Sequence, residues 1–192
     1  MIILNLAGNT GVAAYGVVAN TSLVAVALFN GIAQGSQPLI SRSYGRGEEQ
    51  NVRSLLKMAL TTALGLGVLL MIFIFFSAPA VTAVFNSEHD LQLAAYADSG
   101  LRLYFIGFLF AGINIVGTAA LSAVESVKYA FCASISRGFV ATIFFAFVLS
   151  ACFKMTGIWL AFPAAEFATM FITLSGLLCF TKQKGGMYHA KD

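Results

Sequence analysis

The feature that most constrains this chain is the length of its uncharged runs. Residues 1–41 contain no charged side chain, and a second uncharged run covers residues 58–87. About 20 consecutive apolar residues are enough for a helix to cross the hydrocarbon core of a bilayer. Charged residues make up 10% of the chain and hydrophobic ones 59%, against about 25% and 45–50% in soluble domains. We therefore predict an integral membrane protein built from helices, and the composition excludes a disordered chain, a collagen and a disulfide scaffold.

Polar interruptions divide the chain into five complete spans and an N-terminal stub. Met1–Leu6 is apolar but too short to cross a bilayer. Asn, Gly and Thr cluster over residues 5–11, so a helix is expected to break there. The predicted fold class is all-α, a polytopic transmembrane helix bundle over residues 1–181 followed by a polar tail at residues 182–192. The five spans are predicted at residues 12–44, 58–85, 94–122, 129–153 and 158–180.

Lys and Arg are distributed unequally between the two ends of the predicted spans. Nine of the eleven lie around the turn at residues 45–50, around the start of the fourth span, or in the tail. Arg102 and Lys154 lie toward the opposite end. Because cytoplasmic loops of membrane proteins are enriched in Lys and Arg, we expect the turn at residues 45–50 and the C-terminus to be cytoplasmic. The predicted location is the cell (inner) membrane, with several crossings.

Side chains with catalytic or metal-binding chemistry are few. Cys132, Cys152 and Cys179 lie within apolar runs and lack the spacing of a metal or disulfide set. His89 lies in a predicted loop and His189 in the tail, so neither can join a nucleophile within a span. We predict no enzyme activity, no metal site, no cofactor and no nucleic-acid partner. Membrane lipids are the expected surroundings.

One face of the first full span carries a row of polar side chains. Asn30, Gln34, Gln37 and Ser41 recur at the spacing of a single helical face. Since polar groups that face lipid cost free energy, this face is expected to contact protein or water. Two interpretations stay open. The row is either a packing seam in which amides bond to a neighbouring helix, or the wall of a water-filled cavity that binds substrate.

The same stretch contains residues that alter helix packing. Gly31 and Gly35 form a pair of small residues four apart, which permits two helices to approach closely. Pro38 lacks a backbone N–H and loosens the preceding turn. These three residues are therefore predicted to serve as a packing contact or a bending point.

The third span repeats the polar pattern. Asn114, Thr118 and Ser122 follow one another at intervals of four residues. Asn114 and Thr118 are predicted to line the same cavity as the first row. The alternative is hydrogen bonding between helices, which contributes only about 0.6 kcal/mol on average within a membrane.

Glu166 is the strongest single candidate for chemistry. It lies nine residues after Gly157, about 13 Å along a helix and so near the middle of the bilayer. Because an isolated carboxylate is costly at this depth, Glu166 is expected to hold a proton or a cation. The alternative is a protonated glutamate that bonds to a neighbouring helix. Arg137 is expected to extend toward the membrane surface, or to contact lipid head groups or an anionic substrate.

Several segments resemble the MATE (multidrug and toxic compound extrusion) family. The eighth helix of that family and the loop after it are similar to residues 11–20 (GVAAYGVVAN) and 30–47 (NGIAQGSQPLISRSYGRG). Its tenth and eleventh helices are similar to residues 117–131 (GTAALSAVESVKYAF) and 135–139 (ISRGF). Its twelfth helix is similar to residues 157–167 (GIWLAFPAAEF). The resemblance runs from the end of the seventh helix to the tail.

This resemblance implies one six-helix lobe, the C-terminal one, of a twelve-helix antiporter. In the family, two lobes rock against each other around a cavity, and organic cations and drugs leave while Na⁺ or H⁺ enters. Gln34, Pro38 and Glu166 match positions typical of the lobe, whereas Asn114 stands where some branches have an acid, so the cation site of those branches is not expected here. The implied partners are cationic or amphipathic small molecules and an N-terminal lobe outside this chain.

Two other functions are compatible with the sequence. A flippase lobe for lipid-linked oligosaccharides should line its cavity with several Lys or Arg to bind a pyrophosphate. The interiors of the predicted spans contain Arg137 and one acid, Glu166, which favours cationic or neutral cargo. The remaining alternative is a non-transporting membrane subunit or a truncated remnant.

Overall fold

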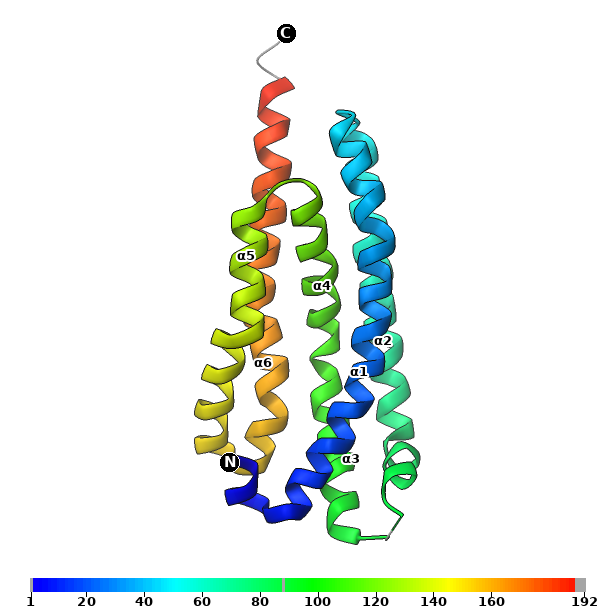
Figure 1. Ribbon diagram of the computed structural model, residues 1–192, viewed down its shortest axis with the longest axis vertical. Coiled ribbons are helices and arrows are strands. Elements are labelled where there is room, and N and C mark those ends of the chain that lie inside the picture. The colour runs from blue at the N-terminus through cyan, green and yellow to red at the C-terminus, as the bar shows by residue number, and fades with distance from the viewer. Residues whose placement is uncertain (1, 88, 189–192) are drawn as a thin grey trace.

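The regular elements of this protein are helices throughout the part of the chain that the structure describes. The computed structural model describes residues 2–87 and 89–188, with side chains described to Thr181. The helices run along the long axis of the molecule (Figure 1). The predicted all-α bundle is confirmed. In chain order the elements are α1 (Ile2–Gly45), α2 (Glu49–Phe85), α3 (Leu91–Ile106), α4 (Phe108–Ala123), α5 (Val127–Ile135), a π-helical turn η1 (Ser136–Val140) and α6 (Ala141–Tyr188).

A break at Gly8 separates the N-terminal stub from the first full span. The backbone of Gly8 has φ 60° and ψ −157°, a left-handed φ that glycine adopts readily. The break falls inside the predicted stretch at residues 5–11. Residues 2–7 lie across one end of the bundle, and the rest of α1 then runs along it (Figure 1).

A reversal at Lys154 joins the fourth and fifth spans. Lys154 has φ 52° and ψ −126°, and the chain turns back within α6 (Figure 1). Gly157 makes the turn possible, because a Cβ there would collide with the carbonyl oxygen of Leu149. The apolar stretch Val127–Thr181 has 55 residues, and this reversal divides it into two crossings of about the usual length.

The membrane-spanning segments follow the predicted order. Among the described residues, Ile2–Gly45, Glu49–Phe85 and Val127–Thr181 are long and apolar enough to cross a bilayer. The pair α3 and α4 also qualifies when it is taken as one bent span. With Val127–Thr181 divided at Lys154, the described part of the chain contains the five predicted spans and the stub.

The third span is bent, which the sequence did not predict. α3 and α4 meet at Gly107 with a bend of 45°. A Cβ at Gly107 would strike the ring of Phe162 and come within 3.1 Å of the Pro163 Cα. The absence of a side chain at Gly107 therefore allows α6 to approach closely at the bend. The ring of Phe162 also stacks on Tyr104, with centroids 4.2 Å apart.

The fourth span is interrupted by the π-helical turn η1. Its wider backbone spacing appears in the hydroxyl of Thr142, which donates a hydrogen bond of 2.7 Å to the carbonyl of Arg137, five residues earlier. π-Helical turns of this kind occur frequently at functional sites. The span at residues 129–153 was predicted without this turn.

The core is centred on α4, which packs against α1, α2 and α6. Phe29, Phe108 and Trp159 are buried in the larger of two apolar clusters. Leu121 and Leu177 belong to the smaller cluster. α4 therefore lies at the centre of the helix packing, next to the elements that line the cavity described below.

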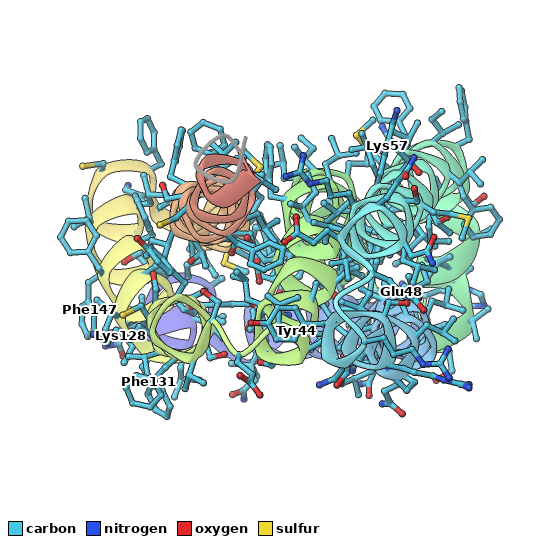
Figure 2. The ribbon with its side chains drawn as sticks, turned by 90° about the horizontal axis from the view of Figure 1, so that it is seen from above. Tyr44, Glu48, Lys57, Lys128, Phe131 and Phe147 are labelled. Atoms are coloured by element: carbon cyan, nitrogen blue, oxygen red, sulfur yellow. The ribbon has the colours of Figure 1, made fainter. Side chains whose placement is uncertain are left out.

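The outer surface is apolar. Phe76 is 77% exposed, and Phe131 and Phe147 are each more than half exposed. Seen along the bundle, Phe131 and Phe147 point away from the helices (Figure 2). Such a surface suits helices surrounded by lipid, which is as apolar as these side chains.

The two ends of the bundle carry different connections. The α1–α2 turn, the α4–α5 connection and the last turns of α6 lie at one end, and the stub, the α2–α3 connection and the reversal within α6 lie at the other (Figure 1). This arrangement matches the predicted grouping of the Lys- and Arg-rich connections. α6 remains helical to Tyr188, beyond the predicted start of the tail at residue 182, and residues 189–192 lie outside the described residues.

Candidate functional site

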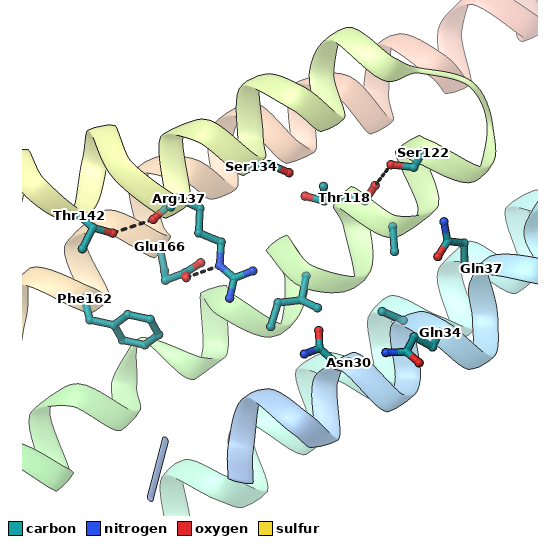
Figure 3. A pocket seen from close by; sticks show the side chains of 14 residues that line it. Asn30, Gln34, Gln37, Thr118, Ser122, Ser134, Arg137, Thr142, Phe162 and Glu166 are labelled. Atoms are coloured by element: carbon teal, nitrogen blue, oxygen red, sulfur yellow. Dashed lines mark hydrogen bonds and ion pairs between the residues drawn. The ribbon is translucent and has the colours of Figure 1, made fainter. Parts of the chain in front are cut away.

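A cavity of about 580 Å³ lies between α1, α4 and the chain from α5 to α6. Its wall combines amides, hydroxyls and an ion pair with apolar side chains (Figure 3). Of the predicted polar candidates, Ser41 and Asn114 do not line it, whereas the other five do. The polar residues on which the following argument depends are Asn30, Gln34, Gln37, Thr118, Arg137 and Glu166.

The row of amides on α1 faces this cavity. Asn30 and Gln34 are exposed and Gln37 is half-buried. None of these three side chains forms a hydrogen bond with another residue in the described part of the chain. Within this lobe the packing-seam interpretation is therefore wrong for the three amides, and their donors and acceptors remain available to water or a ligand.

A second polar wall comes from α4. Thr118 lines the cavity, as predicted from its position on the third span. Ser122, one turn later, also lines it and donates a hydrogen bond of 3.0 Å to the carbonyl of Thr118. The two walls place amides and hydroxyls on opposite sides of the same space (Figure 3).

Glu166 is paired with Arg137. The Nε of Arg137 donates to Oε1 of Glu166 at 2.6 Å, across from η1 to α6. The Glu166 side chain is 3% exposed and that of Arg137 is 30% exposed. The expectation that Arg137 extends to the membrane surface is wrong, because the π-helical turn directs it to this carboxylate instead. Two opposite charges within otherwise uncharged spans were the signal in the sequence that could have predicted the pair.

Asn114 lies behind the cavity wall rather than on it. Its side chain is fully buried and does not line the cavity. Its Nδ2 donates to Oε2 of Glu166 and to the Glu166 carbonyl, each at 2.8 Å. Its Oδ1 accepts a hydrogen bond of 2.9 Å from the hydroxyl of Thr173. The predicted cavity position is therefore wrong for Asn114, which positions the carboxylate from behind.

The predicted close contact of Gly31 and Gly35 is not made within the described lobe. Both are exposed, and a Cβ at either would meet nothing within 4 Å. Pro38 is also exposed, and the non-helical torsion angles of α1 occur at Gly8 and not near Pro38. These three residues lie on an open face of α1, next to the amides that line the cavity.

A comparison with protein-family models decides the family of the chain. Residues 1–148 match the MatE model. The chain belongs to the MatE family. No curated protein matches the MatE-family chain closely enough to be informative.

Solved structures give this MatE chain its place in a larger fold. It is similar to an inward-facing multidrug resistance MATE family transporter of the MOP superfamily, with 17% identity, a TM-score of 0.88, and coverage of 96% of this chain and 43% of that one. An outward-facing structure of such a transporter gives 16% identity, a TM-score of 0.87, and coverage of 96% and 42%. A MOP superfamily transporter from Pyrococcus furiosus, described as having a binding pocket of reverse polarity, gives 16% identity, a TM-score of 0.85, and coverage of 95% and 41%.

The MatE chain thus spans about two fifths of the length of these solved structures. It has the fold of one lobe of a MATE transporter and is a multi-pass membrane protein. The solved relatives are transporters rather than enzymes. Among the described residues, no group of three or more His, Cys, Asp or Glu is placed to hold a metal ion.

Proposed function

We propose that this chain is the C-terminal lobe of an antiporter that exports organic cations and other amphipathic small molecules in exchange for Na⁺ or H⁺. The transporter would include an N-terminal lobe outside this chain and would lie in the cell (inner) membrane with a cytoplasmic C-terminus. One observation carries the proposal: three amides, Thr118 and a buried carboxylate converge on a single cavity within a lobe of this fold.

The shape of the site supports a two-lobed transporter. The cavity is bounded by α1, α4 and the α5–α6 stretch, and its α1 side carries exposed amides and glycines. A second lobe placed against this side would enclose a substrate. Rocking of one lobe against the other would then expose the site to each side of the membrane in turn.

The lining supports organic cations or neutral amphipathic molecules as cargo. Amide and hydroxyl oxygens of Gln34 and Thr118 can accept hydrogen bonds or solvate a positive charge, and the ring of Phe162 offers an apolar surface that attracts cations. A pyrophosphate carrier needs several basic groups. Among the residues that line this cavity, Arg137 is the one basic side chain, and Glu166 neutralises it.

The coupling ion is assigned to Glu166. This carboxylate lies at the cavity wall and is almost completely buried, so water stabilises its charge poorly. Arg137 compensates that charge in the ion pair, and Na⁺ or H⁺ that enters the cavity would compensate it in place of Arg137. The fixed amide of Asn114 on Oε2 keeps the carboxylate in place while its other oxygen changes partner.

The experiment is efflux of ethidium by membrane vesicles that contain the complete transporter, driven by a Na⁺ or a H⁺ gradient. Gln34→Leu removes a polar group from the wall and is expected to reduce efflux about tenfold. Gln92→Leu is the matched control, since Gln92 is an exposed amide at the start of α3 outside the cavity. Gradient-independent leakage in every sample, or an equal effect of both substitutions, would refute the proposed function.

A further inference from the structure

Arg137 covers the buried carboxylate on its cavity side. Both residues line the cavity, and the Arg137 side chain is ten times more exposed than that of Glu166, at 30% against 3%. The Arg137 Nε reaches Oε1 of Glu166 at 2.6 Å. In Figure 3 the guanidinium lies between Glu166 and the open part of the cavity. A cation that approaches Glu166 from the cavity therefore meets Arg137 first.

The two partners of Glu166 differ in how firmly they are held. Asn114 is fully buried, bonds twice to Glu166 and accepts a further hydrogen bond from Thr173. Arg137 uses its Nε alone, and its two terminal nitrogens have no partner among the described residues. The amide is thus fixed, whereas the guanidinium can leave the carboxylate by side-chain rotation.

The backbone beneath Arg137 favours such a rotation. Arg137 lies in the π-helical turn, where the Thr142 hydroxyl satisfies its carbonyl group. The next residue is Gly138, and a Cβ there would meet nothing within 4 Å. The backbone next to Arg137 therefore has no neighbouring side chain packed against it at this position.

We propose that Arg137 is a tethered counter-ion, which occupies the cation position on Glu166 and is displaced into the cavity when Na⁺ or an organic cation binds there. This inference rests on the proposed function, because it describes how the same site is controlled. One buried carboxylate compensates one positive charge well and two poorly, since the second positive charge would be desolvated without a partner. Arg137 and a bound cation therefore exclude each other at Glu166.

Because Arg137 and a cation bind the same carboxylate, Arg137 competes with the transported cation for Glu166. While Arg137 is paired, no net charge attracts a cation to the wall, and a weakly bound cation is released easily. When a cation takes the carboxylate, the freed guanidinium repels a second cation from the same cavity. Arg137 would therefore set the affinity for cations by competing with them for Glu166.

The test measures binding of tetraphenylphosphonium, a permanent organic cation, to the complete transporter in nanodiscs by equilibrium dialysis. Arg137→Gln removes the competitor and is expected to tighten binding about tenfold, within the usual range of coupling between two sites. In Arg137→Gln/Glu166→Gln the gain disappears. Arg102→Gln is the charge-matched control, because Arg102 is exposed, lies over the ring of Phe75 and does not line the cavity. Unchanged or weaker binding in Arg137→Gln, or a gain that persists in the double variant, overturns the proposal.

A second measurement separates this inference from the proposed function. Melting of the purified protein is followed in NaCl and in N-methylglucamine chloride at equal ionic strength, without any substrate. Na⁺ should raise the melting temperature of Arg137→Gln and leave Glu166→Gln unaffected, whether or not the protein exports drugs. Equal shifts of the melting temperature in both variants overturn the proposal that Arg137 is a tethered counter-ion.

If Arg137→Gln does not fold, Arg137→Lys replaces it in both measurements, because a lysine keeps the charge without the planar guanidinium. The Arg137→Lys variant should then bind tetraphenylphosphonium two- to threefold more tightly than the unaltered transporter, by about 0.5 kcal/mol. Binding no tighter than that of the unaltered transporter overturns the proposal.

Discussion

Two polar regions of this lobe lie beside the same cavity and differ in how their hydrogen-bonding groups are satisfied. Behind the α4–α6 wall, Glu166 is bonded to Arg137 and Asn114, and Asn114 is bonded to Thr173. On α1, the side-chain amides of the facing row have no hydrogen bond within the described part of the chain. We refer to these as the buried network (Asn114, Arg137, Glu166, Thr173) and the amide row (Asn30, Gln34, Gln37).

The difference teaches how polar residues divide their roles in a membrane helix bundle. A polar group that is buried in protein must be paired, because an unpaired one costs the full penalty of losing water. The buried network meets this demand and fixes how α4, η1 and α6 pack. The amide row is exposed to the cavity, where water can satisfy it, so it is free to exchange water for a solute. The following predictions test this division, from the largest expected effect to the smallest.

Asn114→Leu should be the most damaging single substitution. It removes two hydrogen bonds from Glu166 and one from Thr173, and we expect a loss of about 3 kcal/mol of stability. Asn30→Leu makes the same change in the amide row and should cost less than about 0.5 kcal/mol. The measurement is the midpoint of denaturation in detergent. Equal losses would show that the two regions do not differ as described.

The ion pair of Arg137 and Glu166 should contribute less to the stability of the protein than the Asn114 amide, which positions the carboxylate. A double-mutant cycle with Arg137→Gln and Glu166→Gln is expected to give a coupling energy of about 2 kcal/mol, because each single variant leaves one charge without its partner. The same cycle between Gln34→Leu and Glu166→Gln should give a value near zero, since no hydrogen bond joins those side chains. A coupling near zero in the first cycle would mean that the pair is not formed in the folded protein.

Two glycines extend the comparison to the backbone. A Cβ at Gly117 would meet Cγ2 of Thr173 at 2.5 Å, whereas a Cβ at Gly31 would meet nothing within 4 Å. Gly117→Ala should therefore destabilise the protein by about 1–2 kcal/mol through overpacking beside the buried network. Gly31→Ala should stabilise α1 by about 0.5–1 kcal/mol, as alanine does in a helix. Thermal melting of both variants checks this, since the melting temperature should fall for Gly117→Ala and rise for Gly31→Ala.

The smallest effect on stability is expected at Pro38. Pro38→Ala restores one helical hydrogen bond in an exposed turn of α1, and the gain should stay below about 1 kcal/mol. If α1 bends at this turn during transport, efflux turnover should fall more than substrate affinity. A loss of affinity alone would assign Pro38 to a static wall.

The sequence predicted the spans well because their causes are local. Uncharged runs of sufficient length give the spans, and the Asn- and Gly-rich stretch at residues 5–11 gives the break observed at Gly8. Helical spacing alone placed the amide row on one face, and the structure brings that face to the cavity together with Thr118. These features follow from neighbours within about two helical turns.

The features that the sequence did not predict depend on partners far along the chain. The bend at Gly107 lies where α6 brings Phe162 and Pro163 against α3 and α4. Asn114 and Thr118 are both polar and lie four residues apart, on the same face of α4. Asn114 is nevertheless buried against Glu166, whereas Thr118 lines the cavity. The orientation of α4 about its axis relative to α6 decides between these positions. The residue pattern within α4 does not predict this orientation.

The sequence by itself therefore determined that this is a helical membrane protein with five spans and that polar groups are concentrated on two of them. Hydrophobicity and helical periodicity fix these properties, since both act along the chain. The tertiary structure alone decided which polar groups are paired. Arg137 and Glu166 meet because a π-helical turn and the reversal at Lys154 bring two spans together in one register. A charge within the bilayer needs a partner, and which partner it finds is settled only when the helices pack.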